Sequence, residues 1–390
     1  MAESFQLART PHLHFGAGKI ELLPSLLKRY GSNVLLITGK KSFTSSPHGN
    51  TVLGQLNKNG FVVETYSISG EPSPAVVDNA VTSFSEWSPQ VVLAIGGGSV
   101  LDAGKAISAM LPLKDGVKNY LEGVGNKSHS GKKIPFVAAP TTAGTGSEAT
   151  KNAVLAETGQ NGFKKSLRHD NFVPDVAIVD PALSLSCPPN VSAASGMDAF
   201  TQLLESFLST SANAITDSLA LAGLQRIARS LFNAFSDGTN LSARTDMAMA
   251  SYLSGITLAN AGLGAVHGLA GTIGGMYDIP HGVICSSLML SANEVTLRKL
   301  RKHGDPTGAL VKYARVGTIF STQTGRSNDY YADFLVNQIR ELKNAMQIPT
   351  LSACGLSMQR LNEIANNSDS KNNPVVLERD ELEEVLSLTM

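Results

Sequence analysis

Short, continuous apolar runs alternate with amphipathic stretches in the first half of the chain. Stretches such as Ala75–Trp87 and Val100–Met110 have helical spacing. The apolar runs are rich in β-branched residues and end in Gly, Pro, Ser or Thr, which is typical of strands covered on both faces. This alternation predicts a mostly parallel α/β sheet. The predicted strands are Val34–Thr38, Phe61–Tyr66, Val91–Ile95, Phe136–Ala139 and Val176–Val179.

The pattern changes near Cys187, where strand-like runs almost disappear. The Pro188-Pro189 pair is a natural boundary, because proline does not continue the preceding element. We therefore expect an α/β domain over residues 1–186 and an all-helical domain over residues 187–390. The predicted helices of the second domain are rich in Ala and Leu: Asn190–Leu208, Asn213–Phe235, Ala243–Ala261, Val266–Met276 and Ser327–Met346.

Composition narrows the class of protein. The 390 residues include 32 Lys and Arg against 32 Asp and Glu, so the net charge is zero. Nucleic acids and acidic membranes attract a basic excess, and we expect neither as a partner. Cys187, Cys285 and Cys354 are far apart and form no CxxC pair, which favours a reducing compartment. We expect these cysteines to be core or surface residues and not nucleophiles. No apolar run approaches the ~20 residues of a membrane span, and the first residues lack signal-peptide features. We expect a cytoplasmic protein.

Two glycine-rich loops follow predicted strands. Residues 96–99 read Gly-Gly-Gly-Ser and open a helix, and residues 140–150 contain four threonines and a serine among small residues. A helix N-terminus offers free N–H groups to phosphate, and glycine lets the phosphate approach closely. The first loop matches neither GxGxxG nor the Walker motif, and a turn without ligand is the alternative. Two such loops at the carboxyl ends of strands favour a bound dinucleotide.

A sparse set of polar residues in the second half could bind a metal ion. Asp198 and Gln202 are spaced i, i+4 on one face of a predicted helix. His267 lies in a glycine-rich helical stretch, and His281 follows in the predicted turn 279–282. One aspartate and two histidines could ligate a divalent ion and leave a position open for a substrate oxygen. Alone, so sparse a set does not establish a metal site.

Five motifs follow one another along the chain: GGGSxxDxxK at 96–105, PTTAGTGSE at 140–148, Asp180-Pro181, residues 196–199 (GMDA), and His267 with Pro280-His281-Gly282. Together they resemble the iron-containing (group III) alcohol dehydrogenase family over nearly the whole chain. That resemblance implies a dehydroquinate synthase-like fold, with an N-terminal dinucleotide-binding domain and a C-terminal helical domain for metal and substrate. It also implies a homodimer or larger homo-oligomer acting on a small alcohol or aldehyde.

The resemblance also implies roles for single residues. The metal, iron or zinc, would polarise the substrate oxygen for hydride transfer to or from nicotinamide. Asp198, His267 and His281 would be catalytic, and together with Gln202 they would be the metal ligands. The predicted cofactor-binding residues are Gly97, Gly98, Ser99 and Asp102 around the pyrophosphate, Thr141, Thr142, Thr145 and Lys164 near the nicotinamide ribose and phosphate, and Gly39, Lys40 and Ser73.

Two positions depart from the family pattern. Gln202 stands where the family usually has a histidine ligand, and an amide oxygen is a weaker donor for iron or zinc than imidazole. Gly271 stands where many members carry a further histidine near the nicotinamide, which widens the pocket and removes an acid/base group.

The residues after the first strand bear on cofactor choice. NAD-preferring relatives tend to carry an acidic residue where this chain has Gly39-Lys40-Lys41. An acidic residue would repel a 2′-phosphate, whereas Gly39 does not, and either lysine could pair with that phosphate. We therefore expect NADP(H) to be preferred over NAD(H).

Three alternative functions stay open at this point. One is a metal-independent reductase resembling maleylacetate reductases, an alternative that the changes at Gln202 and Gly271 leave open. The second is a dehydroquinate synthase-like lyase, and the third is a nucleotide-binding protein without catalysis.

Overall fold

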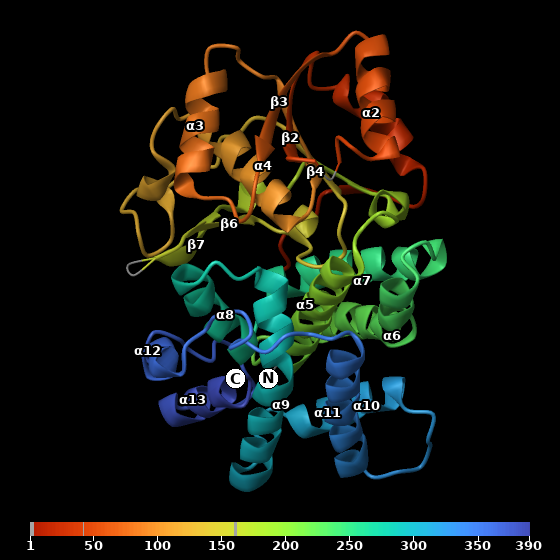
Figure 1. Ribbon diagram of the computed structural model, residues 1–390, viewed down its shortest axis with the longest axis vertical. Coiled ribbons are helices and arrows are strands. Elements are labelled where there is room, and N and C mark those ends of the chain that lie inside the picture. The colour runs from red at the N-terminus through yellow and green to blue at the C-terminus, as the bar shows by residue number, and fades with distance from the viewer. Residues whose placement is uncertain (1–3, 42, 160–161) are drawn as a thin grey trace.

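The computed structural model describes residues 4–41, 43–159 and 162–390. The chain folds into a sheet-containing region, in the upper half of Figure 1, and a helical region below it. The predicted combination of an α/β part followed by an all-α part is confirmed.

A six-stranded, all-parallel sheet forms the first region, in the order β1-β8-β5-β4-β2-β3. After β2 the chain continues outward to β3, and after β4 it continues in the opposite direction to β5. The crevice at the carboxyl ends of β2 and β4 is therefore the switch point at which open α/β sheets bind ligands. The strands are β1 (His12–Phe15), β2 (Asn33–Gly39), β3 (Val62–Ile68), β4 (Val91–Gly96), β5 (Phe136–Pro140) and β8 (Val176–Val179).

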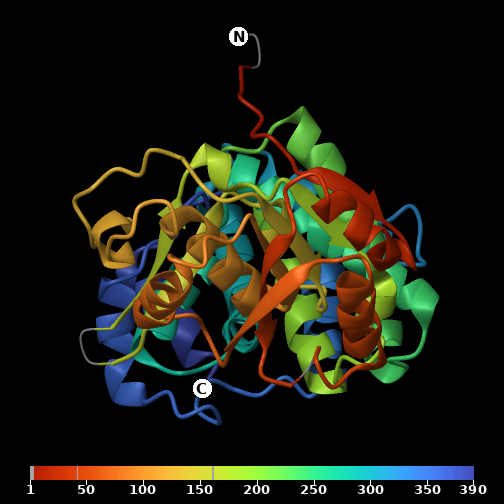
Figure 2. The same ribbon diagram turned by 90° about the horizontal axis from the view of Figure 1, so that it is seen from above.

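The central strands are apolar throughout because both faces of the sheet are covered. Leu35 and Ile37 of β2 pack with α3 (Pro74–Phe84) and α4 (Gly98–Met110). Val34 and Leu36 point the other way and pack with α1 (Leu23–Leu27) and α2 (Pro47–Lys58). The view from above in Figure 2 shows α2 and α3 on opposite sides of β2 and β3. The five predicted strands and the two predicted helices of this region are thus confirmed, with ends shifted by up to three residues.

Two features of the sheet region were not predicted. The edge strand β1 has only four residues, too few for a clear pattern. The antiparallel hairpin of β6 (Asn152–Glu157) and β7 (Phe163–Arg168) forms a separate two-stranded sheet. Ala153, Leu155 and Leu167 pack with the α3 and α4 core. β7 is mostly polar and has no continuous apolar run, whereas residues 153–156 of β6 form a short apolar run that the prediction passed over.

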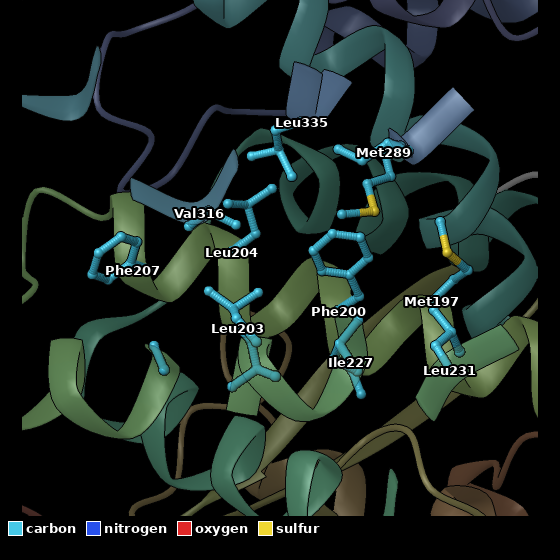
Figure 3. Close-up of a cluster of buried hydrophobic side chains, with 14 of the residues drawn as sticks. Met197, Phe200, Leu203, Leu204, Phe207, Ile227, Leu231, Met289, Val316 and Leu335 are labelled. Carbon is cyan, nitrogen blue, oxygen red and sulfur yellow. The ribbon is translucent and has the colours of Figure 1, made fainter. Parts of the chain in front are cut away.

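The helical region is built around α5, which is buried along most of its length. Figure 3 shows Met197, Phe200 and Leu204 of α5 among apolar side chains of α6, α9, α10 and α11. The helices are α5 (Pro189–Leu208), α6 (Ala214–Ser236), α7 (Leu241–Ala261), α8 (Ala265–Met276), α9 (His281–His303), α10 (Ala309–Phe320), α11 (Asn328–Ala345), α12 (Leu361–Asn366) and α13 (Arg379–Ser387).

The five helices predicted here are confirmed, but the predicted turn at residues 279–282 is wrong in part. His281 is the first residue of α9, with Pro280 at the N-cap, so the turn ends one residue before the histidine. Gly282 in the first turn of α9 disguises the helix, because glycine is a poor helix former.

Within the described residues no single helix is long and apolar enough to cross a membrane, although the pair α7 and α8, bent by 97°, passes on length and composition.

Candidate functional site

The first glycine loop connects β4 to α4 at the switch point of the sheet. Gly97 is the N-cap of α4, and the helix begins at Gly98, so its first N–H groups lie at the carboxyl edge of β4. A Cβ atom at Gly98 would lie 2.6 Å from Thr145 Cγ2, and one at Gly97 would lie 3.4 Å from Thr142 Oγ1. The two predicted cofactor loops therefore pack directly against each other.

The second loop also contacts the helical region. Gly146 has a φ of +60°, and a Cβ atom there would lie 2.5 Å from the backbone oxygen of Ser251 on α7. A Cβ atom at Gly144 would lie 2.7 Å from Ser195 Cβ on α5. Glycine is required at both positions for the loop to fit between the sheet and the helices. This contact places the loop at the junction of the two regions.

Lys105 on α4 ties the two loops together. Its side chain is fully buried, and Nζ lies within 3.1 Å of four oxygens: Ser147 O and Oγ, Thr150 Oγ1 and Asn152 O. Asp102, one turn earlier, accepts from Ser147 Oγ at 2.5 Å and from Val154 N at 3.1 Å. Burial lowers the pKa of Lys105 to about 8 and raises the pKa of Asp102. In this arrangement one oxygen of Asp102 holds the second loop, and the other holds β6.

The other predicted cofactor residues lie around the same edge. Gly39 ends β2, and Lys40 after it is exposed at the switch-point crevice. Ser73 is the N-cap of α3, and its hydroxyl accepts from Val76 N at 3.3 Å. Lys164 on β7 is almost fully buried and pairs with Glu71 at 3.2 Å. Ser99 and Thr141 occupy the two loops themselves. The cofactor roles of all these residues stay predictions.

Four potential metal ligands from three helices lie together in the helical region. Asp198 lies on α5, His267 on α8, and His281 and Cys285 on α9. One donor atom from each lies within 4.8 Å of the other three. Asp198 Oδ1 is 3.4 Å from His267 Nε2 and 3.9 Å from His281 Nε2. Tertiary packing therefore brings together residues that are 87 positions apart in sequence, counted from Asp198 to Cys285.

The donor set fits a divalent metal ion. Asp198 is 1% exposed, and its Oδ1 atom, although close to both imidazole rings, accepts no hydrogen bond within the described residues. A buried carboxylate oxygen without a donor is costly unless a cation compensates it. Carboxylate, imidazole and thiolate groups are common ligands of zinc and ferrous iron.

Glu205 orients His267. It lies one further turn along α5 from Asp198 and Gln202, on the same face. Glu205 Oε1 accepts from the backbone N–H of Val266 at 2.7 Å, and Oε2 lies 2.6 Å from His267 Nδ1. This carboxylate fixes the ring so that Nε2 faces Asp198, which is the usual arrangement of an imidazole ligand.

The environment shifts the pKa of each member of the cluster. Burial opposes the charged form of Asp198, but His281 and His267 outweigh it and hold the pKa below its ordinary value. Burial likewise opposes a charged His267, yet its acidic neighbours, including Cys285 and Glu205, raise the pKa well above 6.5. Burial and the cation of Lys164 lower the pKa of His281. Burial raises the pKa of the Cys285 thiol to about 12.

Gln202 lies beside the cluster but turns its amide oxygen away from it. Gln202 Nε2 donates to Asp198 Oδ2 at 3.0 Å, and Oε1 accepts from Ser254 Oγ at 2.8 Å. The reverse orientation would set the amide oxygen against a carboxylate oxygen, so this assignment is the favourable one. Gln202 thus lies beside the other predicted ligands, but the amide oxygen that would bind a metal accepts a hydrogen bond from Ser254. Its role as a ligand stays a prediction.

Gly271 lies one turn after His267 on α8. A Cβ atom there would meet no other described residue within 4 Å, its own helix backbone aside. This agrees with the extra room expected at the position.

Two members of the site were missed in the sequence. Glu205 continues the 198, 202 face of α5, and Cys285 follows His281 at i, i+4. Both spacings are visible in the sequence and could have identified Glu205 and Cys285 as further members of the site.

Comparison with known proteins assigns the family. Residues 10–181 match the family described as iron-containing alcohol dehydrogenase, and residues 192–390 match its C-terminal part. The chain is 30% identical over 388 residues to an NADPH-dependent butanol dehydrogenase from Clostridium saccharobutylicum, covering 96% of this chain and 95% of the relative. It is 38% identical to a long-chain-alcohol dehydrogenase from Geobacillus thermodenitrificans over 70% of this chain and 68% of that one. A solved 1,3-propanediol oxidoreductase superposes with a TM-score of 0.89, at 28% identity and 100% coverage of both chains. The chain therefore belongs to the iron-containing alcohol dehydrogenase family and is an oxidoreductase.

Proposed function

We propose that the protein is a metal-dependent, NADP(H)-linked oxidoreductase that interconverts a small alcohol and its aldehyde or ketone. The observation that carries the proposal is the buried cluster of Asp198, His267 and His281, in which Asp198 lies on the helix that the second glycine loop contacts. With family membership established, the lyase and the non-catalytic nucleotide-binding protein have no observation in their favour.

The protein's own residues would prepare the site. Asp198, His267 and His281 would hold the metal, and Glu205 would keep the His267 ring turned toward it. A divalent metal bound there supplies Lewis-acid polarisation of a substrate oxygen, and nicotinamide supplies or accepts the hydride. The Lys105 contacts would hold both glycine loops in one fixed arrangement for the cofactor phosphates.

Three observations support the proposed room for substrate and the proposed choice of cofactor. Gly271 leaves free space one turn from His267, which favours a substrate with some bulk near the metal. Lys40 and Lys41 are exposed after β2 at the switch point, where a 2′-phosphate would find a cation in place of a carboxylate. The relative from Clostridium saccharobutylicum carries NADPH in its name. A cytoplasmic homodimer or larger homo-oligomer completes the proposal.

The test is metal content of the purified protein by mass spectrometry, together with NADPH and NADH oxidation on a panel of aldehydes and ketones. We expect about one equivalent of metal, turnover lost on chelation and restored by metal, and a higher kcat/KM with NADPH. Undiminished turnover without metal would move the protein to the metal-independent reductases. Equal kcat/KM for both cofactors would overturn the NADP(H) preference.

A further inference from the structure

The metal cluster contains a fourth donor that the family resemblance does not account for. Cys285 is fully buried on α9, and its Sγ atom lies 3.7 Å from His267 Nε2 and 3.6 Å from His281 Nε2. It follows His281 by one helical turn, so both side chains emerge on the same face of α9. That face looks onto Asp198, whose Oδ1 completes the cluster.

The predicted fourth ligand is committed elsewhere. Gln202 uses its N–H group to hold Asp198 Oδ2 and its oxygen to bind Ser254. To ligate a metal through oxygen, its amide would have to turn over and give up its hydrogen bond to the Asp198 carboxylate, while Ser254 Oγ could accept from the amide N–H instead. A hydrogen bond to a charged group is worth about 1.5–3 kcal/mol. Cys285 has no comparable conflict, because its neighbours in the cluster are themselves potential ligands.

The unpaired oxygen of Asp198 provides independent support for a cation at this point. With Oδ2 bound by Gln202, Oδ1 faces the two imidazole rings and the thiol, and no donor in the described parts of the chain hydrogen-bonds it. A cation placed among these four groups would compensate that buried oxygen.

We propose that Cys285, and not Gln202, is the fourth protein ligand of the metal, in the set Asp198, His267, His281 and Cys285. The inference rests on the proposed metal dependence and refines it. Gln202 is then a positioning residue that orients Asp198. On binding, the thiol releases its proton to solvent and ligates as thiolate. A thiolate selects softer metals, so the site favours zinc or ferrous iron over magnesium or manganese.

Cobalt(II) is the direct probe of this ligand set. We would remove metal from the purified protein with a chelator, titrate it with cobalt(II), and record the near-ultraviolet spectrum. A thiolate ligand produces a sulfur-to-cobalt charge-transfer band, whereas oxygen and imidazole ligands do not. We expect the band to saturate at one equivalent. Zinc affinity, measured by competition with a chromophoric chelator, provides a second readout that does not depend on turnover.

Matched variants assign the band to one sulfur. Cys285→Ser keeps the side-chain shape but should abolish the band and weaken zinc binding by at least about 100-fold. Cys187→Ser and Cys354→Ser replace the other two thiols and should leave both readouts unchanged. Gln202→Met removes both amide hydrogen bonds and should keep the band, with zinc binding weakened by the ~10–100-fold typical of a lost supporting contact.

The outcomes separate this inference from the proposed function. Stoichiometric cobalt binding without a charge-transfer band would overturn the role of Cys285 while metal dependence stands. The same holds if Cys285→Ser binds zinc as tightly as the unmodified protein, or if Gln202→Met loses metal binding altogether. Failure to bind either metal would overturn both proposals.

Discussion

Replacing Lys105 by methionine tests whether one buried cation holds the two predicted cofactor loops in place. The methionine side chain retains most of the apolar stem of lysine but not the ammonium group. In the unmodified protein Nζ lies within 3.1 Å of oxygens of Ser147, Thr150 and Asn152, and 3.9 Å from Asp102. The substitution therefore removes the ammonium contacts of α4 to the second glycine loop and to the start of β6, with little change in volume.

Two opposing effects set the magnitude. The variant leaves the carbonyl oxygens of Ser147 and Asn152 without this donor, at about 1–3 kcal/mol each. It also leaves Asp102 without its cation, and removing one partner of a buried pair costs about 3–5 kcal/mol. Against this, burial of the charge is relieved. A pKa lowered from 10.5 to about 8 corresponds to roughly 3 kcal/mol at 1.36 kcal/mol per pKa unit. The balance is a net loss of about 2–8 kcal/mol.

The assay is urea unfolding followed by fluorescence of Trp87, the only tryptophan of the chain. Trp87 packs against Phe84 at the edge of the α3 and α4 core, so its signal reports the sheet region. Lys118→Met is the matched control, because Lys118 is half exposed and forms one ion pair, with Glu157. Its loss should be under about 1 kcal/mol. We also expect weaker NADPH binding in the Lys105 variant, since both loops lose a common support.

A loss below about 1 kcal/mol with Lys105→Met would refute this reasoning. It would mean that the buried oxygens find other donors, or that relief of charge burial equals the lost contacts. A decrease in the free energy of unfolding of the predicted size, together with an unchanged affinity for NADPH, would refute the link between Lys105 and the cofactor loops.

Three further predictions concern other positions. Gly271→Ala should raise the free energy of unfolding by about 0.5–1 kcal/mol, because alanine is the better helix former and the site is open. Gly268→Ala in the same helix should lower it, since the new Cβ would lie 1.8 Å from a backbone oxygen; equal urea midpoints for the two would contradict this. Lys40→Ala and Lys41→Ala together should raise the KM for NADPH up to about 5-fold, the value of one exposed ion pair of about 1 kcal/mol, and leave the KM for NADH unchanged. Burial raises the pKa of Glu148 from 4.5 to about 7, so the unmodified protein should lose roughly 3 kcal/mol as pH rises between those values, and Glu148→Gln should remove that loss. If the difference in urea midpoint between Glu148→Gln and the unmodified protein is the same at pH 5 and at pH 8, the predicted effect of Glu148 ionisation is excluded.

The pattern of the sequence was sufficient for elements with a strong local signal. Apolar runs buried on both faces predicted the four inner strands, and a run rich in β-branched residues predicted the edge strand β3. The long Ala- and Leu-rich helices were predicted because most of their residues face a core. The edge strand β1 is short and β7 is mostly polar, so neither was predicted, and the apolar run of β6 was passed over. His281 was placed in a turn, not in α9, because Pro280 and Gly282 are typical of turns.

Residue type and spacing along the chain define which groups are available for chemistry, whereas the packing of distant helices brings particular groups together. Asp198, His267 and His281 were candidates from residue type and family resemblance alone. Helical spacing places Gln202 and Glu205 on the face of Asp198, and Cys285 on that of His281, but it does not say what each face contacts. The packing of α5, α8 and α9 turns the thiol of Cys285 into the cluster and draws the amide oxygen of Gln202 to Ser254. Local spacing sets the direction of a side chain, whereas its partners depend on contacts between distant segments that no local pattern records.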